Sequence, residues 1–516
     1  MDRDRIGHLT GMQTTMRVAT AVDGTVVDII PSQQTGVLLD HVNGLTAKPL
    51  RSFDAADMSA FLRNTSMPKL TTLVVNHEVP THIPGTPIFP FPMFNLPSDK
   101  FPSLSSIKMT YAAVHFLPSM ASQLRVLHIN SSVIGFSLGL FLAPFLECLS
   151  GFPHIEELCL TRCFAPPAVN PSAPEGVLAS VRRPLNASRL QNLRIEDYPS
   201  NIGRIMHELI VPTSAMVLLS GIVCGASPEE CGWAFQAMLP HDRTRLPILQ
   251  FCKAIEVAVY RHGCQVDALM REGDISGSPQ FPSSSRLLLR LYTDICDIAH
   301  NLNTPWDARL SLFSTVLSGL KHMFQDTRNV TFFKVCGPDG FESIEEDVWA
   351  DTLVRFPNLR HLVAEDEERM EFPEPLLDAL GIPEGLSEIT APLLCPNLDS
   401  LELGGGDISG VVDSDSDSDI DTEDSDTDTE DTNTENTNAE NTDTEDTDTE
   451  GGGVAQLDHI IACLASRREH GGLTTLRNLK VEISSRVAVP EQVLARYRRE
   501  FYRLAINYSL EAKLLE

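Results

Sequence analysis

A short apolar pattern recurs along the whole chain: an apolar residue, a proline, and then L-x-x-L-x-L, in which x is mostly polar. The copies that contain the proline begin at Met67, Phe101, Phe152, Phe356 and Cys395. Copies that lack it lie around Leu124, Leu190, Leu289, Val330 and Leu476. Alternating apolar residues form a short strand with one buried face, and proline keeps the residue before it extended. The pattern therefore predicts a series of short parallel strands.

Helical patterns lie between these predicted strands. Apolar residues spaced three and four apart, as on one face of a helix, occur around Phe61, Val316, Ile460 and Tyr497. The strands are mostly about 30–40 residues apart, which leaves room for a helix and a loop in each unit. The predicted fold class is therefore α/β: a leucine-rich-repeat-like solenoid of alternating helices and short parallel strands. The helix that follows Pro490 is expected to cap its open end.

One segment has a very different composition. Residues 413–450 contain 18 Asp and Glu and no Lys or Arg, so the rest of the chain carries −12 of the net charge of −30. Such a segment cannot bury enough apolar surface to fold and is expected to be disordered. It interrupts one unit of normal length, so it is read as a loop insertion. The predicted organisation is an uncertain N-terminal segment or degenerate repeats (1–54), the solenoid (55–412), the acidic loop (413–453), and a last repeat with the capping helix (454–516).

The cysteines and the longest apolar run bear on location. Eleven cysteines without a C-x-x-C pair indicate reduced thiols, and no secretory signal follows Met1, so a cytoplasmic or nuclear location is expected. Residues 133–152 are about as long as a bilayer is thick and carry only Glu147 as a charge. Pro144 and the neighbouring glycines favour a buried helix over a membrane span.

Catalytic and cofactor motifs are not found. The chain has no H-E-x-x-H sequence, P-loop or dinucleotide fingerprint. The pentapeptide G-D-I-S-G occurs at 273–277 and at 406–410, but it is not a nucleophile elbow, and turns explain it better. The sequence therefore predicts a protein that is not an enzyme, with no cofactor and no metal site.

The strand positions that point away from the core are the candidate binding residues. In each L-x-x-L-x-L copy the residue between the last two apolar positions faces outward, onto the concave side. The basic residues at these positions form the predicted partner-binding stripe: Lys108, His128, Arg194, Arg290, Lys334 and Lys480. Val74, Cys159, Val363 and Glu402 occupy the other positions. Basic residues on exposed strands also discourage aggregation, which is the alternative interpretation. A further hypothesis is that the acidic loop folds back on this stripe as a brake.

The region from about 347 to 483 resembles the fungal, chiefly basidiomycete, F-box and leucine-rich-repeat-like proteins. The matching segments are Val348–Leu353, Phe356–Leu362, Leu393–Leu401, Ile460–Arg467 and Leu476–Leu479. The resemblance implies an N-terminal F-box that docks a Skp1-type adaptor of a cullin ubiquitin ligase, and repeats that hold the substrate. No L-P-x-E-L-L-like core is found in residues 1–60, so either the start is missing from the gene model or the chain has only the repeat half.

Two functions follow as expectations. The first is a non-catalytic protein-interaction solenoid that binds a protein substrate on its concave face, as a substrate-recognition subunit of a Skp1–cullin–F-box-type ubiquitin ligase. A Skp1-type adaptor would be a partner if an F-box exists upstream. The alternative is an acidic scaffold or histone-type chaperone that works through the acidic tract. A monomer that binds neither nucleic acid nor membrane is expected.

Overall fold

The structure is a computed structural model, and the part of the chain that it describes has several gaps. The described residues are 16–20, 26–29, 42–50, 52–77, 91–115, 118–131, 140–165, 184–223, 228–260, 263–270, 286–293, 307–337, 344–366, 373–381, 394–407, 452–471, 476–485 and 489–514. The acidic tract, its expected disorder and its proposed role as a brake lie outside these residues.

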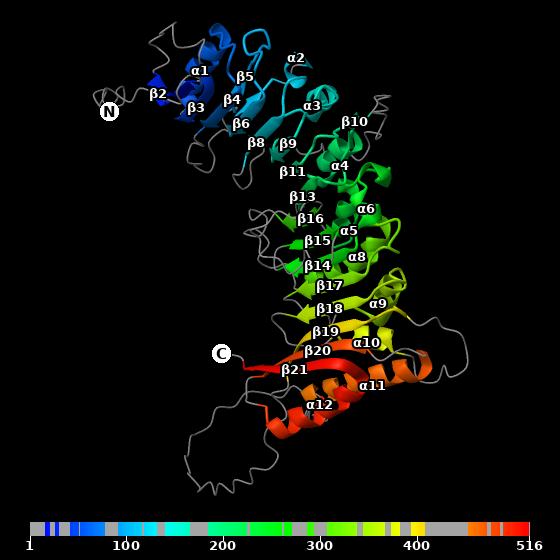
Figure 1. The fold of residues 1–516 in the computed structure, drawn as a ribbon. Coiled ribbons are helices and arrows are strands. Elements are labelled where there is room, and N and C mark those ends of the chain that lie inside the picture. The colour runs from blue at the N-terminus through cyan, green and yellow to red at the C-terminus, as the bar shows by residue number, and fades with distance from the viewer. Residues whose placement is uncertain are drawn as a thin grey trace, which may run out of the picture.

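A 17-stranded, mostly parallel sheet forms the centre of the fold (Figure 1). Its strands are β1 (Met16–Thr20), β2 (Val26–Ile29), β3 (Val42–Leu50), β4 (Thr72–His77), β6 (Ser106–Thr110), β8 (Val126–Asn130), β9 (Glu157–Thr161), β11 (Asn192–Asp197), β13 (Met216–Val223), β14 (Ala254–Tyr260), β15 (Gly263–Leu269), β16 (Arg286–Thr293), β17 (Phe332–Gly337), β18 (His361–Asp366), β19 (Ser400–Asp407), β20 (Leu476–Ser485) and β21 (Ala505–Leu514). Two small sheets pair β5 (Met93–Phe94) with β7 (Ala113–Val114), and β10 (Leu185–Asn186) with β12 (Leu209–Ile210).

The strands follow chain order except at two places. From β3 to β13, and again from β17 to β21, each strand of the large sheet pairs in parallel with the next one. At the N-terminal end, β1 lies antiparallel between β2 and β3. Between β13 and β17 the meander β14–β15–β16 is inserted in reverse order, so that β16 pairs with β13 and β14 pairs with β17. The sheet is therefore continuous but not uniformly built.

The helices lie along one side of this sheet (Figure 1). Those in the described residues are α1 (Ser52–Asn64), α2 (Pro118–Ala121), α3 (Leu142–Leu149), α4 (Pro199–His207), α5 (Pro228–Met238), α6 (Ile248–Phe251), α8 (Asp307–Met323), α9 (Glu346–Leu353), α10 (Glu374–Leu380), α11 (Gly452–Gly471) and α12 (Glu491–Leu504), with a 3₁₀ turn, η3 (Arg243–Arg245). From α4 onward α4, α5, α8, α9, α10, α11 and α12 pack each against the next. The sheet stays open, with β1 and β2 at one end and β21 at the other (Figure 1).

The recurring leucines fill the layer between sheet and helices. In every copy the two alternating positions of the strand are buried, as Leu401 and Leu403 are in β19. The leading residue of the pattern is buried too, where the chain turns into the strand; Leu70, Leu104 and Leu359 are each 0% exposed. The prediction of a mixed α/β fold with many short parallel strands is thus confirmed.

The Pro-Asn-Leu corners are joined to one another by side-chain hydrogen bonds. The Asn397 side-chain amide donates to the carbonyl oxygen of Pro357 at 3.1 Å, and that of Asn358 donates to the carbonyl oxygen of Arg328 at 2.8 Å. Backbone bonds follow the same course, since the N–H of Asp399 reaches the carbonyl of Arg360 at 2.8 Å. Each corner is therefore tied to the corner before it.

This arrangement makes a prediction about stability. Replacing Asn397 by alanine should lower the free energy of unfolding by about 1 kcal/mol, because one hydrogen bond between corners is lost at an exposed site. Urea denaturation followed by circular dichroism measures the change. Asn397→Asp separates the loss of the hydrogen bond from the loss of side-chain volume, because it keeps the size of the side chain but removes the amide donor. It should be at least as destabilising as Asn397→Ala. A stability equal to that of the unchanged chain in both variants would contradict the role of this bond.

Three observations concern the apolar run at 133–152 and the helix that follows Pro490, whose roles the sequence did not determine. The apolar run at 133–152 contains the short helix α3, which follows β8 and precedes β9 in the chain and whose Leu142, Phe145 and Leu149 are buried. No helix in the described residues is long and apolar enough to cross a membrane. The helix after Pro490 is present as α12, but a further strand, β21, follows it directly and extends the sheet. The helix is therefore not the last element of the stack.

Candidate functional site

The side of the sheet that faces away from the helices carries the outward positions of the strands, and we call it the open face. Along β6 and β8, buried and exposed side chains alternate, so that every second residue reaches this face. All six basic residues of the predicted stripe lie in strands of the large sheet, and none of them is buried. The structure thus allows their spacing and their partners to be examined.

Four of the predicted outward residues are neighbours on adjacent strands. Lys108, His128, Cys159 and Arg194 are in register on β6, β8, β9 and β11. Burial, together with the nearby Lys108 ammonium, lowers the pKa of His128, so this residue is mainly neutral at pH 7. Burial also raises the pKa of the Cys159 thiol, which makes it a weak nucleophile.

Carboxylates accompany this group. His128 Nε2 lies 3.1 Å from Glu157 Oε2, and Arg194 Nη2 lies 3.6 Å from Glu196 Oε2. Lys108 is exposed and has no ion-pair partner among the described residues. The N-terminal half of the open face therefore presents separate charged groups of both signs.

Arg290 does not join this row. Arg194 is in register with Leu218 of β13, and Leu218 is in register with Leu288 of β16, whereas Arg290 pairs with Ser220 and Gln265. The sequence alignment placed Leu289 and Leu291 at the two alternating positions, but the structure aligns Leu287 and Leu289 with β13. Several leucines in succession fit either alignment, so periodicity alone could not choose the register. The Arg290 side chain donates to Gln265 Oε1 at 3.0 Å.

A buried polar network at the ends of β9, β11 and β16 is the most connected group on this face. The Tyr292 hydroxyl donates to Glu196 Oε1 at 2.7 Å, and Arg162 Nε lies 3.4 Å from the same oxygen. The Arg162 guanidinium also lies 5.9 Å from the centre of the Tyr292 ring. Burial and the Glu196 carboxylate raise the pKa of Tyr292, so the phenol stays protonated as a donor. Sequence reasoning missed this network because its members are far apart in the chain.

The backbone of Arg162 is strained, and the polar network holds it in this conformation. Its φ of 50° lies in the left-handed region, which is unfavourable for a residue with a long side chain. Its side chain is only 8% exposed. The ion pair and the aromatic contact hold this conformation, and the network therefore fixes the chain where β9 ends. Its groups are satisfied by one another, and the network is a rigid centre of the open face.

The inserted meander contributes an ion pair whose carboxylate is buried and whose arginine is partly exposed. Asp267 of β15 is 1% exposed, and Arg286 of β16 contacts both of its carboxylate oxygens. Burial raises the pKa of Asp267, and the hydrogen bonds from Arg286 oppose that shift. The meander therefore interrupts the row with a pair that is already engaged within the sheet.

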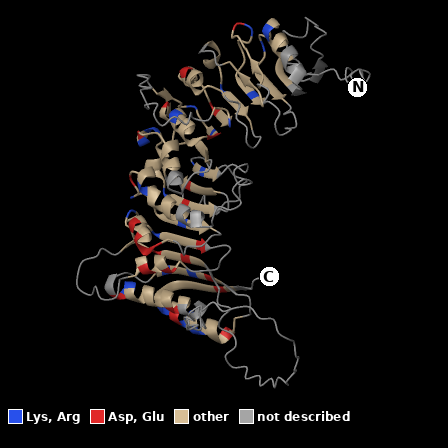
Figure 2. Ribbon diagram, turned by 180° about the vertical axis from the view of Figure 1, so that it is seen from behind, with Lys and Arg blue, Asp and Glu red and all other residues tan. Residues whose placement is uncertain are grey.

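The C-terminal part of the open face is acidic. Lys334 Nζ lies 2.6 Å from Glu365 Oε2, and Lys480 Nζ lies 3.6 Å from Glu482 Oε2. Burial alone would lower the pKa of Lys334, but its bond to Glu365 outweighs burial and raises it, so the amine is charged. Glu402 lies in register between Val363 and Lys480. Figure 2 shows acidic residues along the strands toward the C-terminal end. The six basic residues are thus separated from one another by the meander and by carboxylates, and they do not form one continuous stripe.

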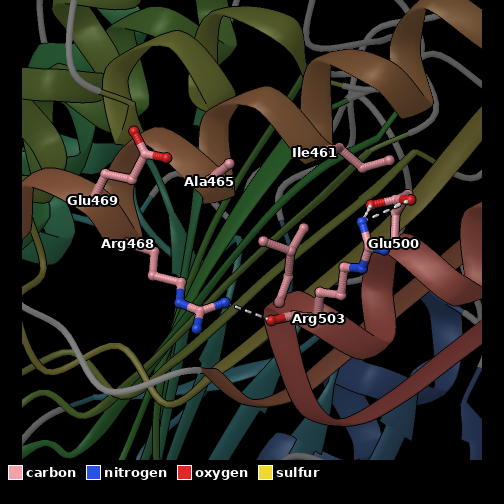
Figure 3. A pocket seen from close by; sticks show the side chains of 7 residues that line it. Ile461, Ala465, Arg468, Glu469, Glu500 and Arg503 are labelled. Atoms are coloured by element: carbon pink, nitrogen blue, oxygen red, sulfur yellow. Dashed lines mark hydrogen bonds and ion pairs between the residues drawn. The ribbon is translucent and has the colours of Figure 1, made fainter.

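A cleft lies elsewhere, between helices α11 and α12 (Figure 3). Its volume is about 430 Å³, and Ile461, Ala465 and Leu504 form its apolar part. The Arg468 guanidinium crosses it and donates to the carbonyl oxygen of Arg503 at 2.8 Å. Its charged groups largely pair within the cleft, so it is a weaker candidate than the open face.

The described residues contain no group of three or more His, Cys, Asp or Glu side chains placed to hold a metal ion. Most of the thiols in this part are buried, and burial raises the pKa of Cys252, Cys395 and Cys463 to about 12. Neither the comparison with protein-family models nor the search of curated proteins gives a match to the chain. The function must therefore be argued from the open face itself.

Proposed function

We propose that the chain is a leucine-rich-repeat-like solenoid and that its open face binds a protein partner without catalysis. The observation that carries the proposal is the contrast between the two sides of the sheet. One side is covered by a row of packed helices, whereas the other carries half-exposed charged residues in register on adjacent strands. Repeat proteins use such extended surfaces for binding. The charged residues of both signs along this face favour a partner that is itself charged, with acidic groups opposite Lys108 and Arg194 and basic groups opposite Glu402.

The more specific form of the proposal makes the chain a substrate-recognition subunit of a Skp1–cullin–F-box-type ubiquitin ligase. It depends on the resemblance of residues 347–483 to fungal F-box and leucine-rich-repeat-like proteins. The alternative, a scaffold or chaperone for basic proteins such as histones, depends on the 18 carboxylates of residues 413–450. The first form requires the open face, and the second requires the acidic tract.

Charge reversal on the open face tests the general proposal. A Lys108→Glu/Arg194→Glu variant should weaken binding of the partner by about tenfold or more, because two charges in the contact surface change sign. The full-length chain and the variant are purified with their bound proteins, and the proteins are identified and quantified by mass spectrometry. The matched control is Arg63→Glu/Arg355→Glu, which changes the net charge equally at two exposed positions, one in helix α1 and one in the turn that follows α9.

The outcomes separate the functions. A partner that is lost from the open-face variant and kept by the control supports recognition by the sheet, and the presence of Skp1 and cullin among the retained proteins supports the ligase form. Histones that disappear only when 413–450 are deleted support the scaffold. A partner that tolerates the open-face reversal as well as the control would overturn the proposal.

A further inference from the structure

The strand β21 leaves one edge of the sheet open. It pairs with β20 over its whole length, from Ala505 to Leu514, and among the described residues it has no strand on its other side. At the opposite end of the sheet the edge strand is β2, which has only 4 residues against the 10 of β21 and pairs with the antiparallel β1. A long strand with an unpaired edge offers a row of backbone N–H and C=O groups to another strand.

Exposed apolar side chains lie beside this edge. Tyr502 of α12 is 70% exposed, Ile506 is 66% exposed and Tyr508 is 37% exposed. The two tyrosine rings contact each other edge to face, with centres 6.3 Å apart. Large apolar residues of this kind are enriched in protein interfaces, and here they occur together at the end of the layer between sheet and helices.

We propose that this surface binds a second copy of the chain, with the two β21 strands pairing antiparallel about a two-fold axis. An identical edge satisfies the backbone groups of both copies at once, as in other two-fold interfaces. The pairing continues the sheet from one copy into the other. It also brings the two α12 helices side by side on the same face of the joined sheet, where Tyr502 and Tyr508 of both copies become buried.

The charges on α12 fit this antiparallel arrangement. Glu491 lies in the first turn, and its carboxylate is 2.5 Å from the Arg498 guanidinium, seven residues further along the same face. In the C-terminal half of the helix Arg503 is paired with Glu500 at 3.1 Å, and Arg498 and Arg499 leave this half basic. Antiparallel helices place the Glu491 end of one copy beside the basic half of the other, and they also oppose the helix dipoles favourably. The inference is independent of any partner on the open face, and it replaces the expectation of a monomer.

Sedimentation and light scattering of the full-length chain test the proposal over a range of micromolar concentrations. The mass should rise with concentration from that of one chain, 56.8 kDa, to that of two. A Tyr502→Lys/Ile506→Lys variant should raise the dissociation constant by about 30-fold or more, because two interface side chains are lost. The control Trp233→Lys/Phe251→Lys replaces residues that are 69% and 51% exposed on α5 and α6, and it should leave the dissociation constant unchanged.

A charge exchange tests the antiparallel geometry separately. A Glu491→Arg variant and an Arg498→Glu/Arg499→Glu variant should each self-associate weakly, and their equal mixture should form heterodimers at least about tenfold tighter than either homodimer. A single-chain mass at every concentration would overturn the proposal, as would equal weakening by the Trp233/Phe251 control. A mixture that associates no better than its components would overturn the antiparallel pairing.

Discussion

Replacing Arg467 by methionine should lower the free energy of unfolding by about 3–5 kcal/mol. The Arg467 residue is 3% exposed and lies four residues before the end of helix α11 (Gly452–Gly471). Its guanidinium donates to three backbone carbonyl oxygens, those of Leu380 at 3.1 Å, Leu394 at 2.6 Å and Cys395 at 2.5 Å. Methionine fills most of the volume but removes all three bonds. The Cys395 carbonyl keeps the backbone N–H of Leu398 at 3.1 Å, whereas those of Leu380 and Leu394 lose their Arg467 donor, and each unsatisfied buried group costs about 1–3 kcal/mol.

These three bonds join segments that are distant in sequence. Leu380 ends α10, whereas Cys395 begins the corner before β19 and has a φ of 47° in the left-handed region. Arg467 therefore stabilises a strained corner from a helix more than 70 residues away.

Urea denaturation measures the effect, with Arg468→Met as the matched control. Arg468 is the next residue, is exposed, and donates only to the Arg503 carbonyl in the described part of the chain. Its replacement should cost about 1 kcal/mol or less. Arg467→Lys should fall between the two, because its single ammonium cannot reach all three oxygens as the planar guanidinium does. Equal losses in the Arg467→Met and Arg468→Met variants would show that the three buried bonds contribute nothing special.

The second large effect is expected at Gly203 in helix α4, where an alanine should destabilise the fold by about 3 kcal/mol. A methyl group at this position would lie 1.8 Å from the carbonyl oxygen of Ala237 in α5. That atom belongs to the backbone, so no side-chain rotation can relieve the clash, and the two helices must move apart. Because α4 and α5 pack against β13, the displacement would also loosen the helix layer over the centre of the sheet.

Gly319 in helix α8 provides the control. A methyl group there would have no atom within 4 Å, so Gly319→Ala meets no clash. It should raise the free energy of unfolding by about 0.5–1 kcal/mol, because alanine favours the helix and restricts the unfolded chain. Urea denaturation of both variants measures the expected loss of stability for Gly203→Ala and the expected gain for Gly319→Ala. A Gly203→Ala chain as stable as the Gly319→Ala chain would contradict the close approach of α4 and α5.

The strands that the sequence predicted best are those with the strongest constraints. A leucine such as Leu398 must fill the corner before a strand, and Leu401 and Leu403 of the strand must face the core. The same L-x-x-L-x-L spacing therefore recurs in each unit and makes these strands predictable. Helix α12 was predictable for the same reason, since Leu494 and Phe501 share its buried face.

Other elements carried no comparable signal. Helix α12 ends at Leu504 and strand β21 begins at the next residue, Ala505, with no glycine or proline at the junction. The sequence therefore gave no signal for the change from helix to strand. The segment Ala254–Tyr260 alternates clearly and was expected as a strand, but periodicity cannot tell which strand lies beside it. Arg467 looked like a charge at a helix end, and its burial depends on the fold of a segment far away.

The binding stripe could be predicted only in part. Outward positions follow from the period of a strand, and Lys108 and Arg194 do lie on the open face. The charge that the stripe presents to a partner also depends on carboxylates from neighbouring strands, such as Glu157 beside His128 and Glu365 beside Lys334. Pairing across strands is a property of the register, which the sequence alone does not determine.

The reversed meander has a consequence for how the chain emerges from the ribosome. Met216 begins β13, but its neighbour β16 begins at Arg286, so 70 residues of further synthesis separate the two strands. Strand addition in chain order can proceed from β3 to β13 and must then wait, with the edge of β13 unpaired. Such exposed edges are where nascent chains associate wrongly, and long-range pairings form slowly. The edge of β13 is therefore open to wrong association while residues 224–293 are being synthesised.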